Sequence, residues 1–237
     1  MESVKRLVGA VFTPAETFRS IRERPTWGWV LVVFLLLGGV AGFVAIQKID
    51  PQMQRTEVRQ QLEKRGLEGD ELDRAVERAT QVTQRFGPVL VGVGLVAGVL
   101  GYLLITLVLW LGLRLAGGEL TFVQGFSATL HGLIPAQALK SLILIPVLFS
   151  VRSVDPQALQ SGAILQSNLA FLAPEGASRA VVALLSSVDV FALWTVVLLV
   201  LGMSIVGRVS KSTSTLVVVG GWVLWVAAKV GWWTLFG

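Results

Sequence analysis

Two long stretches of this chain contain no charged residue, and that feature restricts most strongly what the chain can fold into. Residues 27–46 and 88–113 carry no Asp, Glu, Lys or Arg. About 20 consecutive apolar residues form a helix long enough to cross the ~30 Å hydrocarbon core of a bilayer. The whole chain is 54% hydrophobic and 15% charged, whereas soluble domains are about 25% charged. The two stretches therefore predict membrane-spanning helices.

Further apolar runs extend this pattern to five spans. We predict an all-α integral membrane protein: a bundle of five transmembrane helices with amphipathic interfacial helices at its amino terminus and an extramembrane helical hairpin. An odd number of spans places the two termini on opposite sides of the membrane. Residues 1–26 form a cytoplasmic amphipathic segment and residues 27–237 form the membrane domain. The predicted spans are 27–46, 88–113, 130–149, 180–206 and 215–236.

The segment before the first span has the pattern of helices that lie on a membrane surface. Phe18 and Ile21 are three residues apart, which places them on one face of a helix, and arginines lie between and after them. A helix packed on the protein's own loops would show the same pattern, so both interpretations remain open. Tryptophans then begin the span, where an indole can bury its ring and still form a hydrogen bond. The candidate lipid-surface contacts are Arg19, Arg22, Arg24, Trp27 and Trp29.

Residues 47–87 differ from everything around them, because they contain eight basic and eight acidic residues. Apolar positions such as Leu72 and Val76 recur at three- and four-residue spacing, which indicates helices in water. Gly66 and Gly69 interrupt the pattern. We predict a charged helical hairpin inserted at 47–87. It is either a solvated surface or a site for a partner protein.

The charge distribution bears on orientation and on partners. The chain has a net charge of +5, and its basic residues mostly flank spans or alternate with acids, so anionic lipids are the expected counter-charge and nucleic acid is not. Membrane lipids are the expected partners, together with a protein partner or a second copy of the chain. Basic residues enriched before the first span indicate a cytoplasmic amino terminus. Those five are Lys5, Arg6, Arg19, Arg22 and Arg24.

Three charged residues lie inside predicted spans: Lys140, Asp189 and Lys229. A charge facing lipid costs several kcal/mol, so each needs a partner or a wet cavity. Counted along antiparallel helices, Asp189 and Lys229 come to similar depths and can pair, and Lys140 is within reach of the same carboxylate. This cluster is either a structural ion pair or a site for a proton, an ion or a lipid headgroup. His131, the only histidine, is expected to be interfacial rather than a proton relay.

Sequence motifs for catalysis are absent. The chain contains no Cys and none of the G-x-S-x-G, H-E-x-x-H or Walker A patterns. We therefore expect a protein that is not an enzyme, with no cofactor and no metal site. Gly94 and Gly98, like Gly38 and Gly42, have instead the spacing of small residues where membrane helices approach closely.

The stretch from Phe12 to Trp27, with the sequence FTPAETFRSIRERPTW, resembles the amino-terminal segment of bacterial members of the Yip domain family, which is named for proteins that interact with Ypt/Rab GTPases. Gly117-Gly118, the following Thr121-Phe122 and the third span with Pro135 are similar as well. The resemblance implies a five-span bundle with a cytoplasmic amino terminus. In eukaryotic members it implies roles in membrane trafficking and partner binding, but a prokaryotic host has no Rab system. The family offers no catalytic residues to transfer.

Two functional hypotheses follow from these observations. The first is a non-enzymatic membrane protein that organises lipids or partner proteins. The alternative is a small transporter or permease component that uses Asp189 with Lys140 or Lys229.

Overall fold

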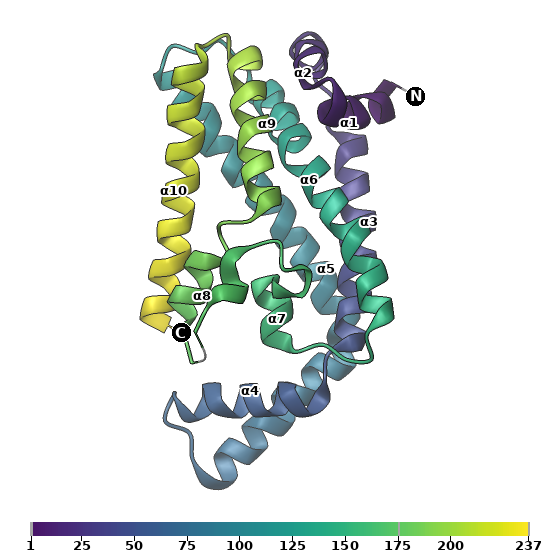
Figure 1. Ribbon diagram of the computed structural model, residues 1–237, viewed down its shortest axis with the longest axis vertical. Coiled ribbons are helices and arrows are strands. Elements are labelled where there is room, and N and C mark those ends of the chain that lie inside the picture. The colour runs from purple at the N-terminus through teal and green to yellow at the C-terminus, as the bar shows by residue number, and fades with distance from the viewer. Residues whose placement is uncertain (1, 175, 237) are drawn as a thin grey trace.

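The computed structural model describes residues 2–174 and 176–236, and five helices in it are long and apolar enough to cross a membrane. They run along the long axis of the molecule, and the amino-terminal helices and the end of the last helix lie at opposite ends (Figure 1). The protein is therefore an all-α multi-pass membrane protein, as its sequence predicts. The five helices are α3 (Gly28–Lys48), α5 (Gly69–Leu115), α6 (Phe122–Ser150), α9 (Val190–Gly207) and α10 (Lys211–Phe236).

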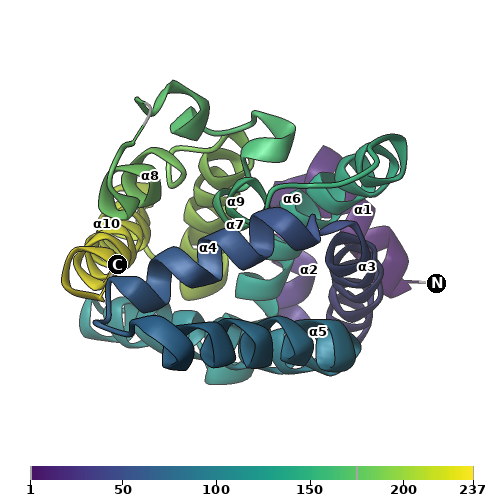
Figure 2. The same ribbon diagram turned by 90° about the horizontal axis from the view of Figure 1, so that it is seen from below.

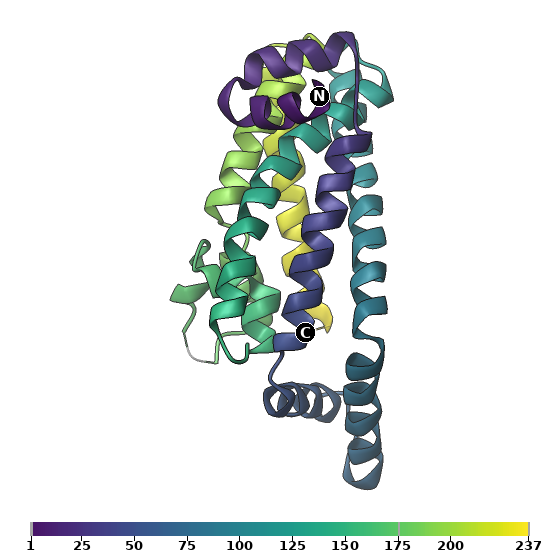
Figure 3. The same ribbon diagram turned by 90° about the vertical axis from the view of Figure 1, so that its right-hand side faces the viewer.

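The two ends of the bundle carry different structures. We call the end with α1 (Glu2–Phe12) and α2 (Pro14–Glu23) the amino-terminal face, and the opposite end, with α4 (Pro51–Glu63), the hairpin face (Figure 3). The segment between α6 and α9 also lies at the hairpin face and is broken into short helices. These are α7 (Pro156–Ser161), η1 (Ala163–Leu165), η2 (Leu169–Leu172) and α8 (Arg179–Leu185).

The predicted charged hairpin is formed by α4 and the first part of α5. Helix α5 has 47 residues, about 70 Å at 1.5 Å per residue, and only its portion from Arg85 onward has the composition of a span. The turn between the arms uses Gly66 and Gly69, both with positive φ (85° and 58°), a conformation that glycine adopts without steric penalty. Helix α4 crosses beneath the bundle (Figure 2). The hairpin thus extends one transmembrane helix directly into water.

Two spans begin at positions that differ from the prediction. The third was expected from residue 130, but α6 begins at Phe122, because Thr121 and Gln124 form a reciprocal capping box. The polar residues that follow are buried by neighbouring helices. The fourth was expected from residue 180, but α9 begins at Val190, because the Asp189 side chain caps it. The apolar residues before this point form the separate short helix α8.

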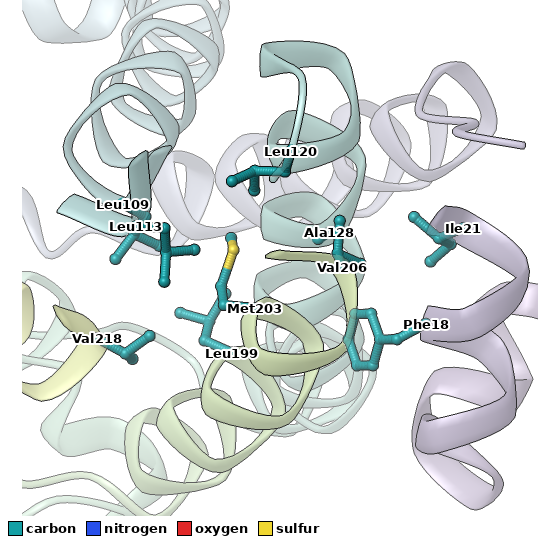
Figure 4. Close-up of a cluster of buried hydrophobic side chains, with 10 residues drawn as sticks. All are labelled: Phe18, Ile21, Leu109, Leu113, Leu120, Ala128, Leu199, Met203, Val206 and Val218. Carbon is teal, nitrogen blue, oxygen red and sulfur yellow. The ribbon is translucent and has the colours of Figure 1, made fainter. Parts of the chain in front are cut away.

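The largest buried cluster lies near the amino-terminal face and joins α2 to the spans (Figure 4). Phe18 and Ile21 of α2 are fully buried there, beside Met203 and Val206 of α9. Gly202 provides the space, because a Cβ atom at that position would lie 2.6 Å from the Phe18 ring. The apolar face of α2 therefore packs on the protein, which agrees with the second of the two interpretations left open by the sequence. On α1, Val8 and Phe12 remain exposed.

Glycines allow α3 and α5 to approach closely, as their spacing predicts. A Cβ at Gly38 would lie 3.0 Å from Leu95, and one at Gly98 would lie 2.9 Å from the Phe34 ring. Gly42 is packed in the same way, against Val91. Gly94 differs, since a Cβ there would meet nothing within 4 Å. Only some of the predicted small-residue positions therefore form this contact.

Candidate functional site

The three charged residues predicted to form a cluster lie at one depth, toward the hairpin face. Asp189 directly precedes the 18-residue helix α9. Lys140 and Lys229 are equally far along α6 and α10 from the ends of those helices at the amino-terminal face. At 1.5 Å per residue this distance is roughly 27 Å, close to the ~30 Å thickness of the hydrocarbon core. The charges therefore form a layer near the far boundary of the membrane rather than at its centre.

Asp189 is the centre of this layer and is 5% exposed. One carboxylate oxygen, Oδ1, accepts a hydrogen bond from the backbone N–H of Phe191 at 2.7 Å, which caps α9. The other, Oδ2, accepts from Lys140 Nζ at 2.8 Å and from the Ser167 hydroxyl at 2.9 Å. Asp189 thus connects α9, α6 and the segment between them.

Backbone pairing in the preceding loop positions the carboxylate. The N–H of Leu169 donates to the carbonyl of Val188 at 3.2 Å, and the N–H of Val190 donates to the carbonyl of Ser167 at 3.1 Å. The buried Asn168 side chain fixes the loop between these bonds, because its amide donates to the Ser161 carbonyl and its oxygen accepts from the Ala170 N–H.

The electrostatic surroundings keep Asp189 ionised. Burial by itself raises the pKa of this carboxyl, but the hydrogen bond and charge of Lys140, together with the Ser167 hydroxyl and the Phe191 N–H, outweigh burial and lower the pKa below its ordinary value. A carboxylate with both oxygens engaged in this way is suited to holding helices together.

Lys229 is placed differently from the prediction. Its ammonium donates to the hydroxyls of Ser186 (2.9 Å) and Ser187 (3.2 Å) at the end of α8, rather than to Asp189. Both hydroxyls in turn donate to the Ala183 carbonyl. Within the described part of the chain, Lys229 forms no ion pair. The sequence brings Lys140 and Asp189 together as expected but leaves Lys229 beside neutral groups.

The candidate lipid contacts at the amino-terminal face fall into two groups. Arg19 and Arg24 are exposed, as are Trp27 and Trp29. Arg22 is half-buried and its guanidinium is 3.5 Å from the carbonyl of Ile205, near the carboxyl end of α9. A cation there stabilises the terminal carbonyls of a helix. Four of these side chains are exposed, while Arg22 contributes to the docking of α2.

His131 is fully buried in α6 and not interfacial. Its Nδ1 is 2.8 Å from the Ser127 carbonyl, so Nδ1 carries the proton and donates. Its Nε2 has no hydrogen-bond partner among the described residues. The expected interfacial position was wrong because α6 begins eight residues earlier than predicted, which moves His131 inward.

Several contacts fix the hairpin to the bundle. The N–H of Val154 donates to the carbonyl of Lys48 at 2.7 Å, and the N–H of Asp50 donates to the carbonyl of Val154 at 3.0 Å. Arg179 of α8 lies 3.5 Å from Glu57 of α4. The arms of the hairpin are joined by ion pairs between Arg55 and Glu77 and between Arg59 and Asp73. The hairpin is therefore held against the bundle by hydrogen bonds and an ion pair.

Sequence reasoning missed the residues that complete these contacts. Ser167, Asn168, Ser186 and Ser187 lie in irregular segments, where no helical or strand periodicity marks a functional position. One signal was present: Asp189 follows two serines and precedes an apolar run, which is the pattern of a helix start.

The chain is similar to known membrane proteins over most of its length. The model of the Yip1 domain matches residues 8–232, which is nearly the whole chain. A membrane protein of Bacillus subtilis (strain 168), YknW, is 26% identical over 206 residues, which are 86% of this chain and 80% of that protein. No solved structure gives a significant match.

Proposed function

The chain belongs to the Yip1 domain family, and we propose that it is a non-enzymatic membrane protein that organises membrane lipids or partner proteins. The observation that carries this proposal is that the hairpin is held against the bundle. A transmembrane helix continues into water as one arm of the hairpin, and the other arm is tied to the bundle through Val154 and Arg179. A partner bound there is held at a fixed position relative to the membrane.

The surface of the hairpin fits a protein partner. Arg74 and Arg78 lie one helical turn apart on α5, and both are exposed; neither side chain is paired in the described structure. Val82, one turn beyond Arg78 on the same face of α5, is an exposed apolar side chain beside them. Mixed charged and apolar surfaces of this kind support binding, with charge guiding encounter and apolar contacts adding affinity.

We further propose that the amino-terminal face is cytoplasmic, in a bacterial inner membrane. Exposed basic side chains gather there from α2 and the residue after it, from the end of α5, and from the turn between α9 and α10 with the first residue of α10. Basic residues favour the cytoplasmic side. The exposed basic residues are Arg19, Arg24, Arg114, Arg208 and Lys211. Exposed Trp27 and Trp29 support a position of this face near the lipid headgroups, which indoles favour.

The transporter alternative finds no support in this geometry. A carboxylate that carries an ion or proton needs acceptor capacity for the cargo, whereas Asp189 already accepts three hydrogen bonds from the protein, out of about four that a carboxylate can accept. The arrangement fits a structural ion pair.

Cross-linking in native membranes, followed by purification in mild detergent and mass spectrometry, tests the partner proposal. The intact chain is compared with Arg74→Glu/Arg78→Glu. The control is Arg114→Glu/Lys211→Glu, which makes the same charge change at the opposite face. We expect a stoichiometric partner that is lost only with the hairpin variant, while the melting temperature is unchanged. A partner retained by the hairpin variant, or no partner with the intact chain, overturns the proposal.

A further inference from the structure

Lys229 carries a positive charge that the described residues leave without a counter-charge. Its partners, Ser186 and Ser187, are neutral, and their hydroxyl protons point to the Ala183 carbonyl. The nearest acid in the layer, Asp189, is held by Lys140 at 2.8 Å. An ammonium has three N–H donors, of which two meet the serines. One donor therefore remains for a ligand.

A count of the charges around α8 and α10 gives the same result. Three cations lie in this region, Lys140, Lys229 and Arg179, and Arg179 stands over the Trp233 ring one turn beyond Lys229. Among the described residues, two carboxylates pair with these cations: Asp189 with Lys140 and Glu57 with Arg179. Lys229 is the one cation of the three that has no carboxylate partner in the described part of the chain. An anion bound there would supply one.

The surroundings of Lys229 face lipid rather than water. Trp225 and Trp232 lie one turn to either side of it on the same face of α10, and they are 62% and 60% exposed. Indoles favour the headgroup level of a bilayer. On the neighbouring α8, Val181 and Leu184 are also exposed. The ligand that fits this position best is therefore an amphipathic anion, with a charged group for Lys229 and an apolar part for the exposed side chains around it.

We propose that Lys229, held by Ser186 and Ser187 and flanked by Trp225 and Trp232, binds the phosphate of an anionic phospholipid in the leaflet at the hairpin face. The depth of Lys229, roughly 27 Å along α10 from the opposite end, allows its flexible side chain to extend to the phosphate level. The acyl chains then lie along the exposed apolar residues of α8 and α10. This site is separate from the partner surface of the hairpin, so either proposal can fail without the other.

Native mass spectrometry of the full chain tests the site. The protein is titrated with phosphatidylglycerol and with phosphatidylcholine of identical acyl chains. We expect the first bound phosphatidylglycerol to bind about tenfold more tightly, the size expected for one charge-assisted hydrogen bond. Lys229→Gln should remove this preference and Lys229→Arg should retain it. Lys64→Gln makes the same charge change on the exposed hairpin turn and should leave the preference intact.

A second variant keeps the test decisive if Lys229→Gln folds poorly. Ser186→Asp places a carboxylate beside Lys229, supplies the missing counter-charge from within the chain and should abolish the preference for phosphatidylglycerol. An unchanged preference in Ser186→Asp or in folded Lys229→Gln overturns the proposal, as does a wild-type protein that binds both lipids equally. Inorganic phosphate is the third probe. If it raises the melting temperature of lipid-free wild type and of Lys229→Arg but not of Lys229→Gln, the ligand is a soluble phosphate and the lipid assignment is wrong.

Discussion

Replacing Asp189 by Asn, Lys140 by Met, and both together measures how strongly this ion pair holds the hairpin end of the bundle. Asn keeps the hydrogen-bonding capacity of a helix cap, so Asp189→Asn removes mainly the charge and leaves Lys140 unpaired. Lys140→Met leaves the Asp189 carboxylate with Ser167 and the Phe191 N–H only. In the double variant neither charge remains.

The structure sets the expected size of these effects. Removing one member of a buried ion pair costs about 3–5 kcal/mol. The Lys140 side chain is 23% exposed and that of Asp189 is 6% exposed. Because the pair is only partly buried, we expect a smaller cost than in a fully buried pair, about 2–3 kcal/mol for each single variant. The double variant should cost no more than either single one. The coupling free energy is then about 2 kcal/mol.

The assay is the free energy of unfolding in mixed micelles, followed by circular dichroism as the denaturing detergent is increased. The pair Arg55 and Glu77, with both side chains about half exposed, is the control, because exposed pairs couple by less than about 1 kcal/mol. Additive effects at Asp189 and Lys140, with coupling below about 0.5 kcal/mol, would refute the claim that this pair is structural.

Two further predictions concern the docking of α2 and the start of the hairpin. Gly202→Val should displace the Phe18 ring, which a Cβ would approach to 2.6 Å, and destabilise the protein by about 1–3 kcal/mol. The melting temperature should fall and protease should cleave α2 faster. Gly220→Val is the control, because a Cβ there meets nothing within 4 Å, and it should change neither quantity. Hydrogen bonds from the backbone N–H groups of Met53 and Gln52 lower the pKa of Asp50 below its ordinary value of 3.8. Because the pKa of Asp50 is lower in the folded protein, the stabilisation by this cap is complete above pH 3.8 and is lost as the pH falls through the folded pKa. The protection of amides at the start of α4 from hydrogen exchange, relative to the unfolded chain, should therefore be constant from about pH 8 to 5. It should weaken only below about pH 4.

The sequence predicts those parts of the fold in which the composition of a segment shows whether it faces lipid or water. Uncharged runs such as 27–46 face lipid, and the charged segment 47–87 faces water, so the spans and the hairpin follow from the residues alone. Amphipathicity, in contrast, shows that α2 has an apolar face but not what covers it. The cover is Gly202 and Met203 of α9, about 180 residues away in sequence.

The candidate site was only partly predictable for a related reason. Depth along a helix follows from counting residues, so Asp189 and Lys229 were expected at similar depth with Lys140 within reach, and all three lie at a similar distance from the amino-terminal face. Rotation about each helix axis and the course of irregular segments do not follow from counting. As a result Asp189 forms hydrogen bonds with Lys140 and Ser167, whereas Lys229 donates to the serines that follow α8.

The orientation of the two faces decides on which side of the membrane the proposed partner and the proposed lipid lie, and the chain is well suited to testing it because it contains no cysteine. Single variants Arg74→Cys on the hairpin and Arg19→Cys on α2 place a thiol at an exposed position on each face. Intact cells are treated with a membrane-impermeant maleimide, before and after permeabilisation. We predict that Arg74→Cys is labelled in intact cells and Arg19→Cys only after permeabilisation. The opposite pattern, or equal labelling of both in intact cells, would contradict the account.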